Sequence, residues 1–567
     1  MKRVFLLSMA GAVALFLVVV SGAHACGDST YIADVTVIPM TGGEVLEHQT
    51  VVVTGNRISQ IGPFNGIPMP DGNCVVEGTG HFLMPGLVDA HAHLFDEGDL
   101  TLYLAHGVTS ILNMSGSYQH LQFRDALASG DMHGPSLYTT GPTIKMSANP
   151  LVEFEDNPVD VAFGAELVRR HFDAGYDFIK VWGEFDPAVY RSMMDTAREL
   201  DIPVTGHIPR PVGLDGVVDQ GQRSIAHVEE LFSRHFNNAP TPEGIAAATI
   251  QLADAGTTVT TTLVTYEAIA AGIAEDVTPL MTRDGIELMD PARQGMWAPG
   301  GNRYRTESRV GMEQRYLDQM AQMQGISLSL YEGGVRLLAG VDAGDLPGLV
   351  PGLDLHREFE LLSEAGLPNE AVLATATQNF GAYLEDNNIG RETVGVIAVG
   401  ARADLLLLTA NPLEDISNTR AIAGVMTRGT YYDQAALTGL TDGLKARNEA
   451  TAQYFGALVS NGAEGGAAHI ANWPDDGTRP LGLVPTVFFA FGQAQQGDPV
   501  GAEATLVQVA GVYPERSEPW LIVAGLRAMM GNAPGALEAY DTALAIAPDH
   551  ERGQRDRAHL VQAMAAN

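Results

Sequence analysis

The feature that most constrains the fold is a regular alternation of short apolar segments with helical patterns through the middle of the chain. The strand-like segments are GLVDAHAHL, GVTSILNMS, PSLYTTGPT, YDFIKVWG, IPVTGHIP, RSIAHVEEL, GTTVTTTLVTY and VRLLAGVDAG. Several follow glycine-containing helix ends, as in AHGVTS and DAGYDF, where a helix is expected to stop before a strand. Eight strands that alternate with helices predict an α/β fold, a (β/α)8 TIM barrel over residues 85–393.

Short β-rich pieces lie on both sides of this predicted barrel. YIADVTVIPM and QTVVVTGNRISQIG precede it, and VGVIAVGARADLLLLT and AIAGVMTRGTYY follow it. These two sets predict one small β-sandwich domain that is built from residues 26–84 and 394–432. Several domains are also expected from the length, because 567 residues exceed what one hydrophobic core organises.

The last part of the chain carries an internal repeat. A helical linker is expected over residues 433–480, and small residues and a proline then return after 34 positions. The pairs are Ala490 and Ala524, Gly497 and Gly531, Ala502 and Ala536, and Pro514 and Pro548. This period predicts all-α, tetratricopeptide (TPR)-like repeats over residues 481–567, with a capping helix at 551–566. The repeats either dock a protein partner or only stabilise the rest of the chain, and the sequence supports both readings.

The first 25 residues have the layout of an export signal. Two basic residues precede an apolar run over 4–20, and residues 23–25 read Ala-His-Ala, a small-x-small cleavage pattern. Cleavage after Ala25 predicts a periplasmic or secreted protein. An uncleaved membrane anchor is the alternative, although the run is near the lower length limit for a membrane span.

The chain has two cysteines, Cys26 and Cys74. Cys26 directly follows the predicted cleavage site, but Ala-His-Ala-Cys is a poor lipoprotein signal, so a lipid-anchored form is disfavoured. In an oxidising compartment the two cysteines could instead form a disulfide.

The charge balance limits the classes of partner. The formal net charge is −35, from 68 acidic and 33 basic residues. Binding to a phosphate backbone requires patches of lysine and arginine, so the composition argues against a nucleic-acid partner. The acidic excess is better interpreted as a solubility property. The chain has only four lysines, Lys2, Lys145, Lys180 and Lys445, so a lysine inside a core strand stands out.

Side chains that bind metals recur where the predicted strands end. His91 and His93 share one face of the first strand, because alternate strand residues point the same way. The later strand ends carry Lys180, His207, His227 and Asp342. The C-terminal ends of barrel strands line the active site, and imidazole with carboxylate suits zinc and similar ions. One histidine alone would be a weak signal, but six such residues at strand ends predict a metal centre.

Lys180 is the unusual member of this set, because an ammonium group repels a metal ion. Carboxylation of its amine by carbon dioxide would give a carbamate, an anion with two oxygens that can bridge two ions. The alternative is an amine that reaches solvent or Glu184. We favour the carbamate, because Lys180 ends an apolar strand in a chain with so few lysines.

The motifs PGLVDAHAH, FIKVW, GHIP, SIAHVEE and GVDAG together resemble the amidohydrolase superfamily of the binuclear metal type, near its imidazolonepropionase-like and prolidase-like branch. The resemblance covers roughly residues 31–432 and leaves out the TPR-like region. It implies two divalent metal ions, with Zn²⁺ favoured and Mn²⁺, Co²⁺ or Fe²⁺ as alternatives, and a bridging hydroxide as nucleophile.

The same resemblance implies a role for each residue. One ion would be held by His91, His93 and Asp342 and the other by His207 and His227, with carboxylated Lys180 between them. Asp342 would also be the catalytic residue that takes the proton from the hydroxide and passes it to the leaving group.

The substrate is less constrained by the sequence. Candidate substrate-binding residues are Arg210, Tyr266, His235 and Lys145, with Tyr118 and Arg234 as further ones. Arg210 lies three residues after His207 and could bind a carboxylate bidentately; a structural ion pair in the HIPRPVG turn is the alternative. The connection over residues 267–334 carries five arginines and is either a lid that supplies an anion-binding arginine or a solvated helical insertion. These arginines are Arg293, Arg303, Arg305, Arg309 and Arg315.

The family branch and the export signal together imply a small-molecule substrate with an amide bond, either a dipeptide or an N-acyl amino acid. Two alternatives stay open. One is hydrolysis of cyclic amides, lactones or other esters on the same site, and the other is an envelope scaffold that acts through the TPR-like repeats. A homo-oligomer is also compatible with the sequence.

Overall fold

The computed structural model describes residues 29–68, 74–146, 155–298, 301–307, 310–344, 346–390, 392–474 and 478–566. The predicted signal peptide and Cys26 lie outside these ranges, so the structure bears on neither the export signal nor the disulfide. Among the helices that it does describe, none combines the length and the apolar character needed to cross a membrane.

Each of the eight predicted strand segments contains a strand, and all of these strands run parallel to their neighbours. One sheet has the order β6 (Leu87–Ala92), β7 (Val108–Asn113), β8 (Ser136–Thr139). A second sheet contains β11 (Ile179–Trp182), β12 (Val204–Gly206), β13 (Ser224–Ala226), β14 (Thr258–Thr260) and β15 (Leu337–Leu338), with β9 (Thr143–Lys145) and β10 (Glu155–Asp156) added at one edge. Isolated parallel bridges pair Ala92 with Ala343 and Thr140 with Phe178, so the first sheet contacts the second at both of its edges.

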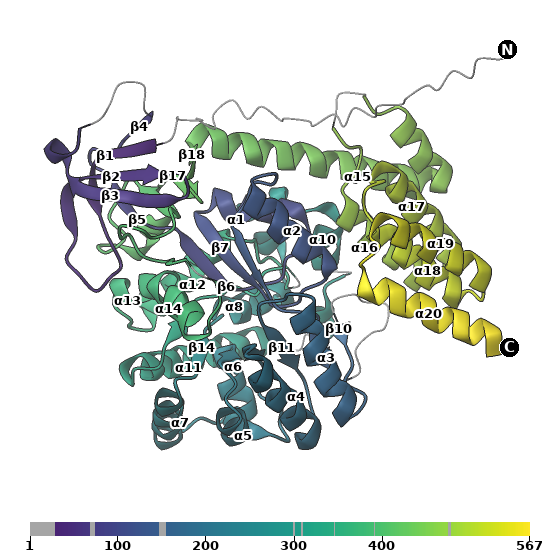
Figure 1. Cartoon of the computed structure of the whole chain (residues 1–567), viewed down its shortest axis with the longest axis horizontal. Helices are drawn as coiled ribbons and strands as arrows, with labels where there is room; N and C mark the ends of the chain where they lie inside the picture. Colours follow the sequence, from purple (N-terminus) through teal and green to yellow (C-terminus); the bar gives the residue numbers. More distant parts are fainter. Residues whose placement is uncertain are drawn as a thin grey trace, which may run out of the picture.

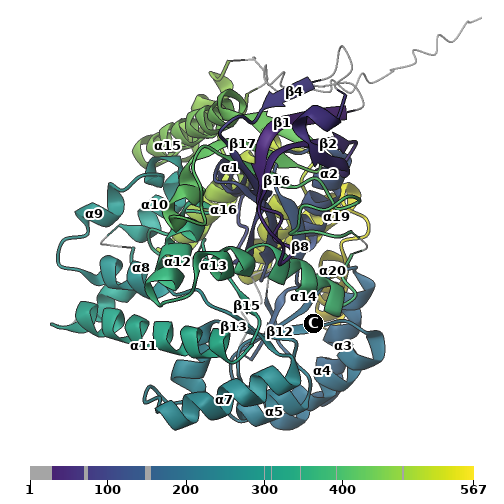
Figure 2. The same ribbon diagram turned by 90° about the vertical axis from the view of Figure 1, so that its left-hand side faces the viewer.

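Helices follow the strands and cover their outer faces (Figures 1 and 2). They are α1 (Glu97–Ala105), α2 (Tyr118–Ser129), α3 (Val161–Asp173), α4 (Pro187–Leu200), α5 (Gly213–Asp219), α6 (Val228–Glu230), α7 (Pro242–Ala255), α8 (Val264–Ile273), α9 (Thr278–Met281), α10 (Pro291–Trp297), α11 (Met312–Glu332), α12 (Leu353–Glu364), α13 (Asn369–Thr375) and α14 (Gln378–Asp386). Aspartates start several of them: the Asp160 and Asp186 side chains accept hydrogen bonds from the first-turn amides of α3 and α4. The helices thereby bury their apolar faces against the sheets and leave the strand ends open for chemistry.

The flanking strands form a single sheet. Its order is β18 (Thr430–Asp433), β17 (Ile422–Thr427), β16 (Leu405–Leu408), β5 (Phe82–Pro85), β1 (Ser29–Val37), β2 (Leu46–Thr54), β3 (Arg57–Pro63), and β4 (Cys74–Glu77) also pairs with β1. The two flanks therefore meet where β5 pairs with β16. A β-sandwich was expected here: β1 has bulges and pairs with β4 along one half and with β5 along the other, so that all eight strands are connected by hydrogen bonds.

The last strand of the N-terminal flank leads directly into the strand that carries the first two predicted histidine ligands. β5 ends at Pro85 and β6 starts at Leu87, with Gly86 between them. The amide of Gly86 donates to the carbonyl of Asp404, and a Cβ at this position would lie 2.3 Å from the side chain of Thr109. Only glycine fits this close approach to Thr109. The contact with Thr109 and the hydrogen bond to Asp404 together fix where β6 starts.

The C-terminal part of the chain is helical. The long helix α15 (Gln434–Ala471), which bends at Gly462, runs from β18 towards the last five helices (Figure 1). These are α16 (Leu483–Gln495), α17 (Pro499–Val512), α18 (Glu518–Met529), α19 (Ala533–Ile546) and α20 (Glu551–Ala566). The segment expected as a linker thus packs as a helix: Arg447 of α15 forms a buried ion pair with Asp96 at the start of α1.

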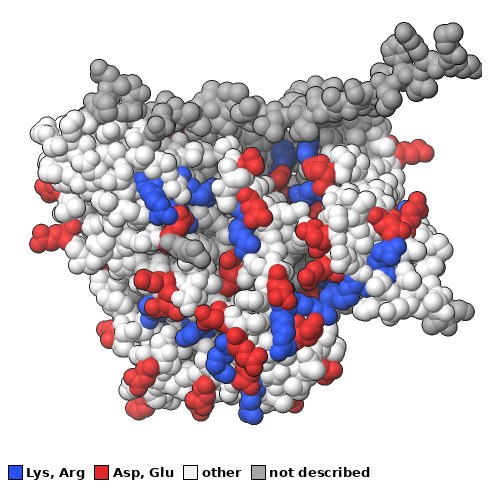
Figure 3. All heavy atoms as spheres, in the orientation of Figure 1, with Lys and Arg blue, Asp and Glu red and all other residues white. Residues whose placement is uncertain are grey.

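Charged side chains of both signs share the visible surface. On the face shown in Figure 3, basic side chains are interleaved with acidic ones along the helices. Arg357, for example, pairs with Glu267, Glu360 and Glu364.

A buried carboxylate joins α12 to the end of β14 and yields a first prediction. Glu358 accepts hydrogen bonds from the Thr261 hydroxyl at 2.5 Å and the Val264 amide at 2.8 Å, and burial, only partly opposed by these bonds, raises its pKa from 4.5 to about 7. The folded protein therefore holds this proton more tightly than the unfolded chain does. Stability from this group is complete below pH 4.5 and is lost as the pH rises towards 7, by about 3 kcal/mol in total.

We expect Glu358→Gln to make the free energy of unfolding depend less on pH between pH 4.5 and pH 7. Urea denaturation at pH 5 and pH 8 would measure it: the variant should lose less stability than the wild type between the two values. Parallel profiles for the two proteins would show that Glu358 does not titrate in this way.

Candidate metal centre

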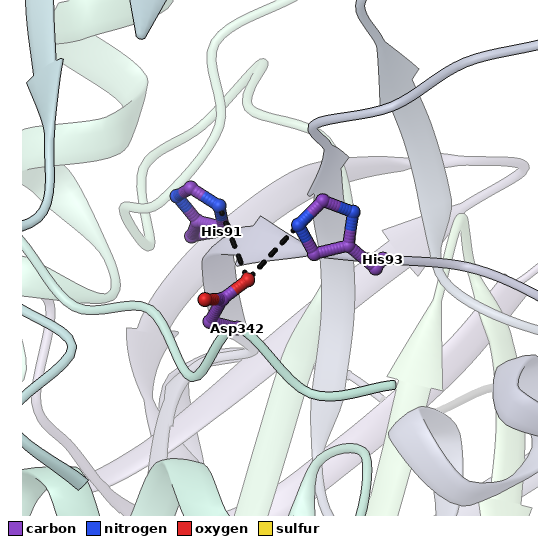
Figure 4. A group of neighbouring side chains, drawn as sticks. All are labelled: His91, His93 and Asp342. Carbon is purple, nitrogen blue, oxygen red and sulfur yellow. Dashed lines mark ion pairs between the residues drawn. The ribbon is translucent and has the colours of Figure 1, made fainter. Parts of the chain in front are cut away.

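Three of the predicted ligands come together at one end of the parallel strands. His91 and His93 project from β6 and its end, and Asp342 follows β15 (Figure 4). The Oδ1 atom of Asp342 lies 2.9 Å from His93 Nε2 and 3.4 Å from His91 Nε2. One ligand atom from each residue lies within 4.8 Å of the other two, a spacing that would admit a single metal ion.

The other predicted residues lie against this group. The ring of His227, which follows β13, is 4.3 Å from that of His91, and the ring of His207, which follows β12, is 5.1 Å from that of His227. Lys180 of β11 is buried, with only 2% of its surface exposed, and its charge interacts with the histidines and with Asp342. The structure therefore brings all six residues into one cluster.

The environment of His91 tests whether this cluster fits a metal. The residue is fully buried, and neither of its ring nitrogens has a hydrogen-bond partner among the described residues. A buried polar atom without a partner is costly. Burial, together with nearby Lys180 and the other histidines, lowers the pKa of His91 well below its usual value, so the ring is neutral and has a lone pair available for an ion.

Lys180 and Asp342 have shifted pKa values that suit their predicted parts. Burial lowers the pKa of Lys180 to about 8, although Asp342 and Glu230 partly oppose this, so the neutral amine that reacts with carbon dioxide is accessible near neutral pH. Burial alone would raise the pKa of Asp342, but its contact with His93 lowers it to about 2. Asp342 is therefore ionised and can act as a ligand or as a proton acceptor.

The backbone at two of these residues is strained. His227 has a φ of 84° and Asp342 a φ of 58°, a region that residues other than glycine rarely adopt. Such conformations cost on the order of 1–3 kcal/mol each and gather at functional sites, where they aim a side chain. Buried Asp89 joins β6 to the segment that carries Asp342, since its Oδ1 accepts hydrogen bonds from the amides of His91 and Val341, both at 3.1 Å.

Two residues that orient ligands were not predicted. His207 Nδ1 lies 2.9 Å from Oε1 of Glu230, a carboxylate that is 1% exposed and whose Oε2 also accepts from the Ile208 amide at 2.7 Å. His227 Nδ1 lies 2.9 Å from the Thr262 hydroxyl. Each partner fixes the ring so that Nε2 faces the cluster. The glutamate pair in SIAHVEE was the available signal for Glu230.

Replacing Glu230 should therefore weaken the site without removing a ligand. We expect Glu230→Gln to lower metal affinity or activity by about 10- to 100-fold, because the amide no longer fixes the tautomer of His207. Titration of the metal-free protein with Zn²⁺ would measure this. Glu229→Gln, one residue earlier, serves as the control and should have a smaller effect, and equal losses in the two variants would contradict an orienting role.

Lys145, one of the substrate-binding candidates, lies near this cluster. Lys145 Nζ is 2.6 Å from Glu155 Oε1 and 4.9 Å from the centre of the Trp182 ring, which in turn contacts His207. Arg210 is largely exposed, and its guanidinium is 3.9 Å from Glu184. That carboxylate also pairs with Arg234.

Tyr266 lies in a helix rather than at the end of a strand, and His235 and Tyr118 contact residues outside the cluster. Tyr266 was placed at the end of strand seven, but β14 ends at Thr260 and Tyr266 lies in α8, because Glu358 accepts from the Val264 amide and starts that helix early. The ring of His235 packs on that of Phe236. Tyr118 donates to Asp549 in the C-terminal region.

The arginine-rich connection forms α9, α10 and α11. Arg293, one of the candidates for an anion-binding lid, is buried and pairs with Asp99 and Asp290. Its role is thus structural, because it neutralises two buried carboxylates behind the loop that follows His93. The interpretation of Arg293 as an anion-binding lid residue was therefore wrong, because its guanidinium is already paired with Asp99 and Asp290.

Comparisons with known proteins match this geometry. The model of the Amidohydrolase family matches residues 82–431, which include all six residues of the cluster. The adenine deaminase of Rubrobacter xylanophilus is 31% identical over 100 residues, a match that covers 15% of this chain and only 16% of the deaminase. Among solved structures, a bottromycin amidohydrolase is similar with a TM-score of 0.61 and 24% identity, covering 74% of this chain and 91% of that one. A Xaa-Pro dipeptidase with bound methionine in its active site has a TM-score of 0.54 and 20% identity, covering 71% of this chain and 100% of that one.

Proposed function

The chain belongs to the amidohydrolase family and is an enzyme, and on that premise we propose that it is a metal-dependent hydrolase that cleaves an amide bond with two metal ions. The observation that carries this proposal is the gathering of three further histidines, Lys180 and Asp342 around His91, whose two buried ring nitrogens have no hydrogen-bond partner among the described residues.

The scaffold proposed for this site is one closed (β/α)8 barrel. Its support is the pair of contacts between the two parallel sheets. At one edge the His93 amide donates to the Ala343 carbonyl at 3.2 Å, and at the other the Gly141 amide donates to the Phe178 carbonyl at 3.1 Å. In such a barrel the C-terminal ends of the strands lie together at one end, and the six residues lie at these strand ends.

The ions would be divided between two sets of ligands. His91, His93 and Asp342 would hold one and His207 and His227 the other, with carboxylated Lys180 between them, and nitrogen and oxygen donors of this kind favour Zn²⁺. Carboxylation joins the amine nitrogen of Lys180 to the carbon of carbon dioxide and releases one proton. Bound divalent ions supply two things, a water whose pKa falls from 15.7 to about 7 and polarisation of the substrate carbonyl.

The protein's own groups then handle the proton. Asp342 is ionised, and its Oδ1 faces the space between His91 and His93, so it can take a proton from the attacking water and return it to the leaving nitrogen. Glu230 keeps His207 in one orientation throughout. Lys145, which lies near the cluster, and Arg210, three residues after His207, are cations that could bind a substrate carboxylate.

The substrate class proposed is a dipeptide or an N-acyl amino acid. The similarity to a Xaa-Pro dipeptidase supports a substrate of the dipeptide type, and Lys145 and Arg210 would suit the free carboxylate of either substrate. Periplasmic or secreted location is proposed from residues 1–25, and TPR-like packing from the helix pairs α16–α17 and α18–α19.

A panel of substrates tests the proposal. Metal-loaded protein would be assayed with dipeptides, N-acyl amino acids, lactones and hydantoins, and its metal content measured by elemental analysis. We expect about two ions per chain and turnover of an acyclic amide. Activity on lactones alone would defeat the amide assignment, and one ion or none would defeat the two-metal assignment.

A further inference from the structure

The C-terminal helices meet the metal centre through two aromatic rings. Phe95 lies two residues after His93, and its ring stacks on the His93 ring with centres 6.5 Å apart. Phe488 of α16 contacts Phe95 edge-on, with ring centres 5.7 Å apart. A residue almost four hundred positions later in the chain thus lies one aromatic contact away from the metal-ligand cluster.

The place of Phe95 shows that these rings border the open side of the centre. A Cβ at Gly344, two residues after Asp342, would lie 2.7 Å from the Phe95 ring, so this ring lies directly over the backbone that carries the aspartate. His93 and Asp342 are partly exposed, at 23% and 21% of their side-chain surface, whereas His91 is fully buried. A ligand therefore reaches the cluster past His93 and Asp342, next to Phe95.

Phe488 differs from the neighbouring aromatic residue of its own helix. Phe489 stacks on Phe455 of α15, with ring centres 4.5 Å apart, and packs against the apolar cluster of the helical region. Phe488 instead contacts Phe95; all three phenylalanines are partly buried, so the two rings of α16 differ in what they contact and not in burial. Its ring is therefore available to contact a ligand, at a position where the fold of the helical region does not use it.

Other contacts hold α16 in this place. Arg447 of α15 pairs with the buried carboxylate of Asp96, the residue after Phe95, and Asn448 donates to the Leu288 carbonyl at 2.7 Å. Ala292 of α10 packs into the apolar cluster that α15 and α16 share. Because these contacts bracket the loop that carries Phe95, the position of Phe488 relative to His93 is fixed.

We propose that Phe488, together with Phe95, forms an apolar wall of the substrate pocket and makes the enzyme select amides whose acyl group or side chain is apolar, with aromatic groups preferred. This inference rests on the proposed function, and it makes the C-terminal helical region part of the active site. Aromatic side chains contribute most when they stack on another ring or meet its edge, and an apolar group bound here would displace water from both phenylalanines.

The test uses binding, so that it does not depend on turnover. Acetohydroxamic acid and benzohydroxamic acid chelate metal ions through the same group and differ only in the apolar part. Their dissociation constants would be measured by calorimetry on the metal-loaded full-length wild type and on Phe488→Ala. The ratio of the two constants isolates the apolar contact, because any change in the metal centre affects both ligands.

We expect the wild type to prefer the benzo compound, and Phe488→Ala to lose about 10-fold or more of this preference while binding acetohydroxamic acid as before. Phe488→Leu, which keeps most of the volume, should retain part of the preference. If Phe488→Ala does not fold, the same comparison of the two dissociation constants is made with Phe488→Leu. Val500→Ala, at an exposed position of α17, is the matched control and should behave like the wild type.

An unchanged ratio in Phe488→Ala, an equal loss for both ligands, or no aromatic preference in the wild type would each overturn the proposal. Turnover of acetyl and phenylacetyl amino acids by the same proteins separates it from the proposed function. If the wild type binds hydroxamates with the expected preference but hydrolyses no amide, then the amide assignment fails and the aromatic wall stands.

Discussion

Replacing Lys180 by alanine should remove at least one metal ion and lower kcat/KM by about 10³-fold or more, since metal-ion catalysis is worth several kcal/mol and each 1.4 kcal/mol is tenfold. Lys180 is almost completely buried between the histidines and Asp342. If it holds two ions as a carbamate, then its loss leaves two cations close together with one bridging anion fewer. Their mutual repulsion then expels the more weakly held ion.

Elemental analysis of the wild type and Lys180→Ala, each prepared with and without bicarbonate, would measure this. The wild type should gain metal with bicarbonate and the variant should not. Lys445→Ala, at an exposed lysine of α15, is the control for a lost positive charge. A short carboxylate such as propionate should restore part of the activity of Lys180→Ala, because it can enter the space left by the side chain. Two firmly bound ions in the variant would contradict the bridging role.

The residues of the cluster could be predicted because they follow simple periodicities. His91 and His93 are two apart on a strand, and the others stand where an apolar segment stops. Both features depend only on local sequence, and the alternation of strands and helices then brings distant strand ends to one place. That is why the whole set of six lies together in the structure.

The contacts that position these residues could not be predicted in the same way. Glu230 reaches His207 across 23 positions, and Thr262 reaches His227 across 35. Nothing in the spacing of such pairs distinguishes a carboxylate that orients a ligand from one that is solvated. Tyr266 was misplaced for a related reason, since the turn at Thr262, with a φ of 49°, ends the strand earlier than its β-rich sequence indicates.

The same limit applies to the C-terminal region. Its repeat reveals helix pairs, because small residues recur wherever two helices cross, but it says nothing about which surface the pairs cover. The docking depends on single complementary pairs, Arg447 with Asp96 and Phe488 with Phe95, which are separated by 351 and 393 positions. The helical region could therefore be recognised from sequence, whereas its place beside the metal centre required the structure.

Replacing Asp342 by asparagine should lower kcat by about 10²- to 10⁴-fold, the range typical of a lost general base or acid, while the protein stays folded. Asparagine has nearly the same shape but accepts no proton at its amide. The φ of 58° at this position is one that asparagine adopts more readily than most residues, so the backbone should keep its conformation. The loss then reports on chemistry and metal binding rather than on folding.

Asp89, a fully buried acid whose side chain accepts from the His91 amide, provides the matched control for Asp342→Asn. Burial raises the pKa of Asp89 to about 8, so near neutral pH it already carries a proton, and Asp89→Asn replaces one neutral acceptor of the His91 and Val341 amides with another. Its effect on kcat should be much smaller. Circular dichroism and metal content would be compared for both variants alongside the assay. Equal losses in the two would mean that any change in this buried corner disables the site, and Asp342 would then not be the group that moves the proton.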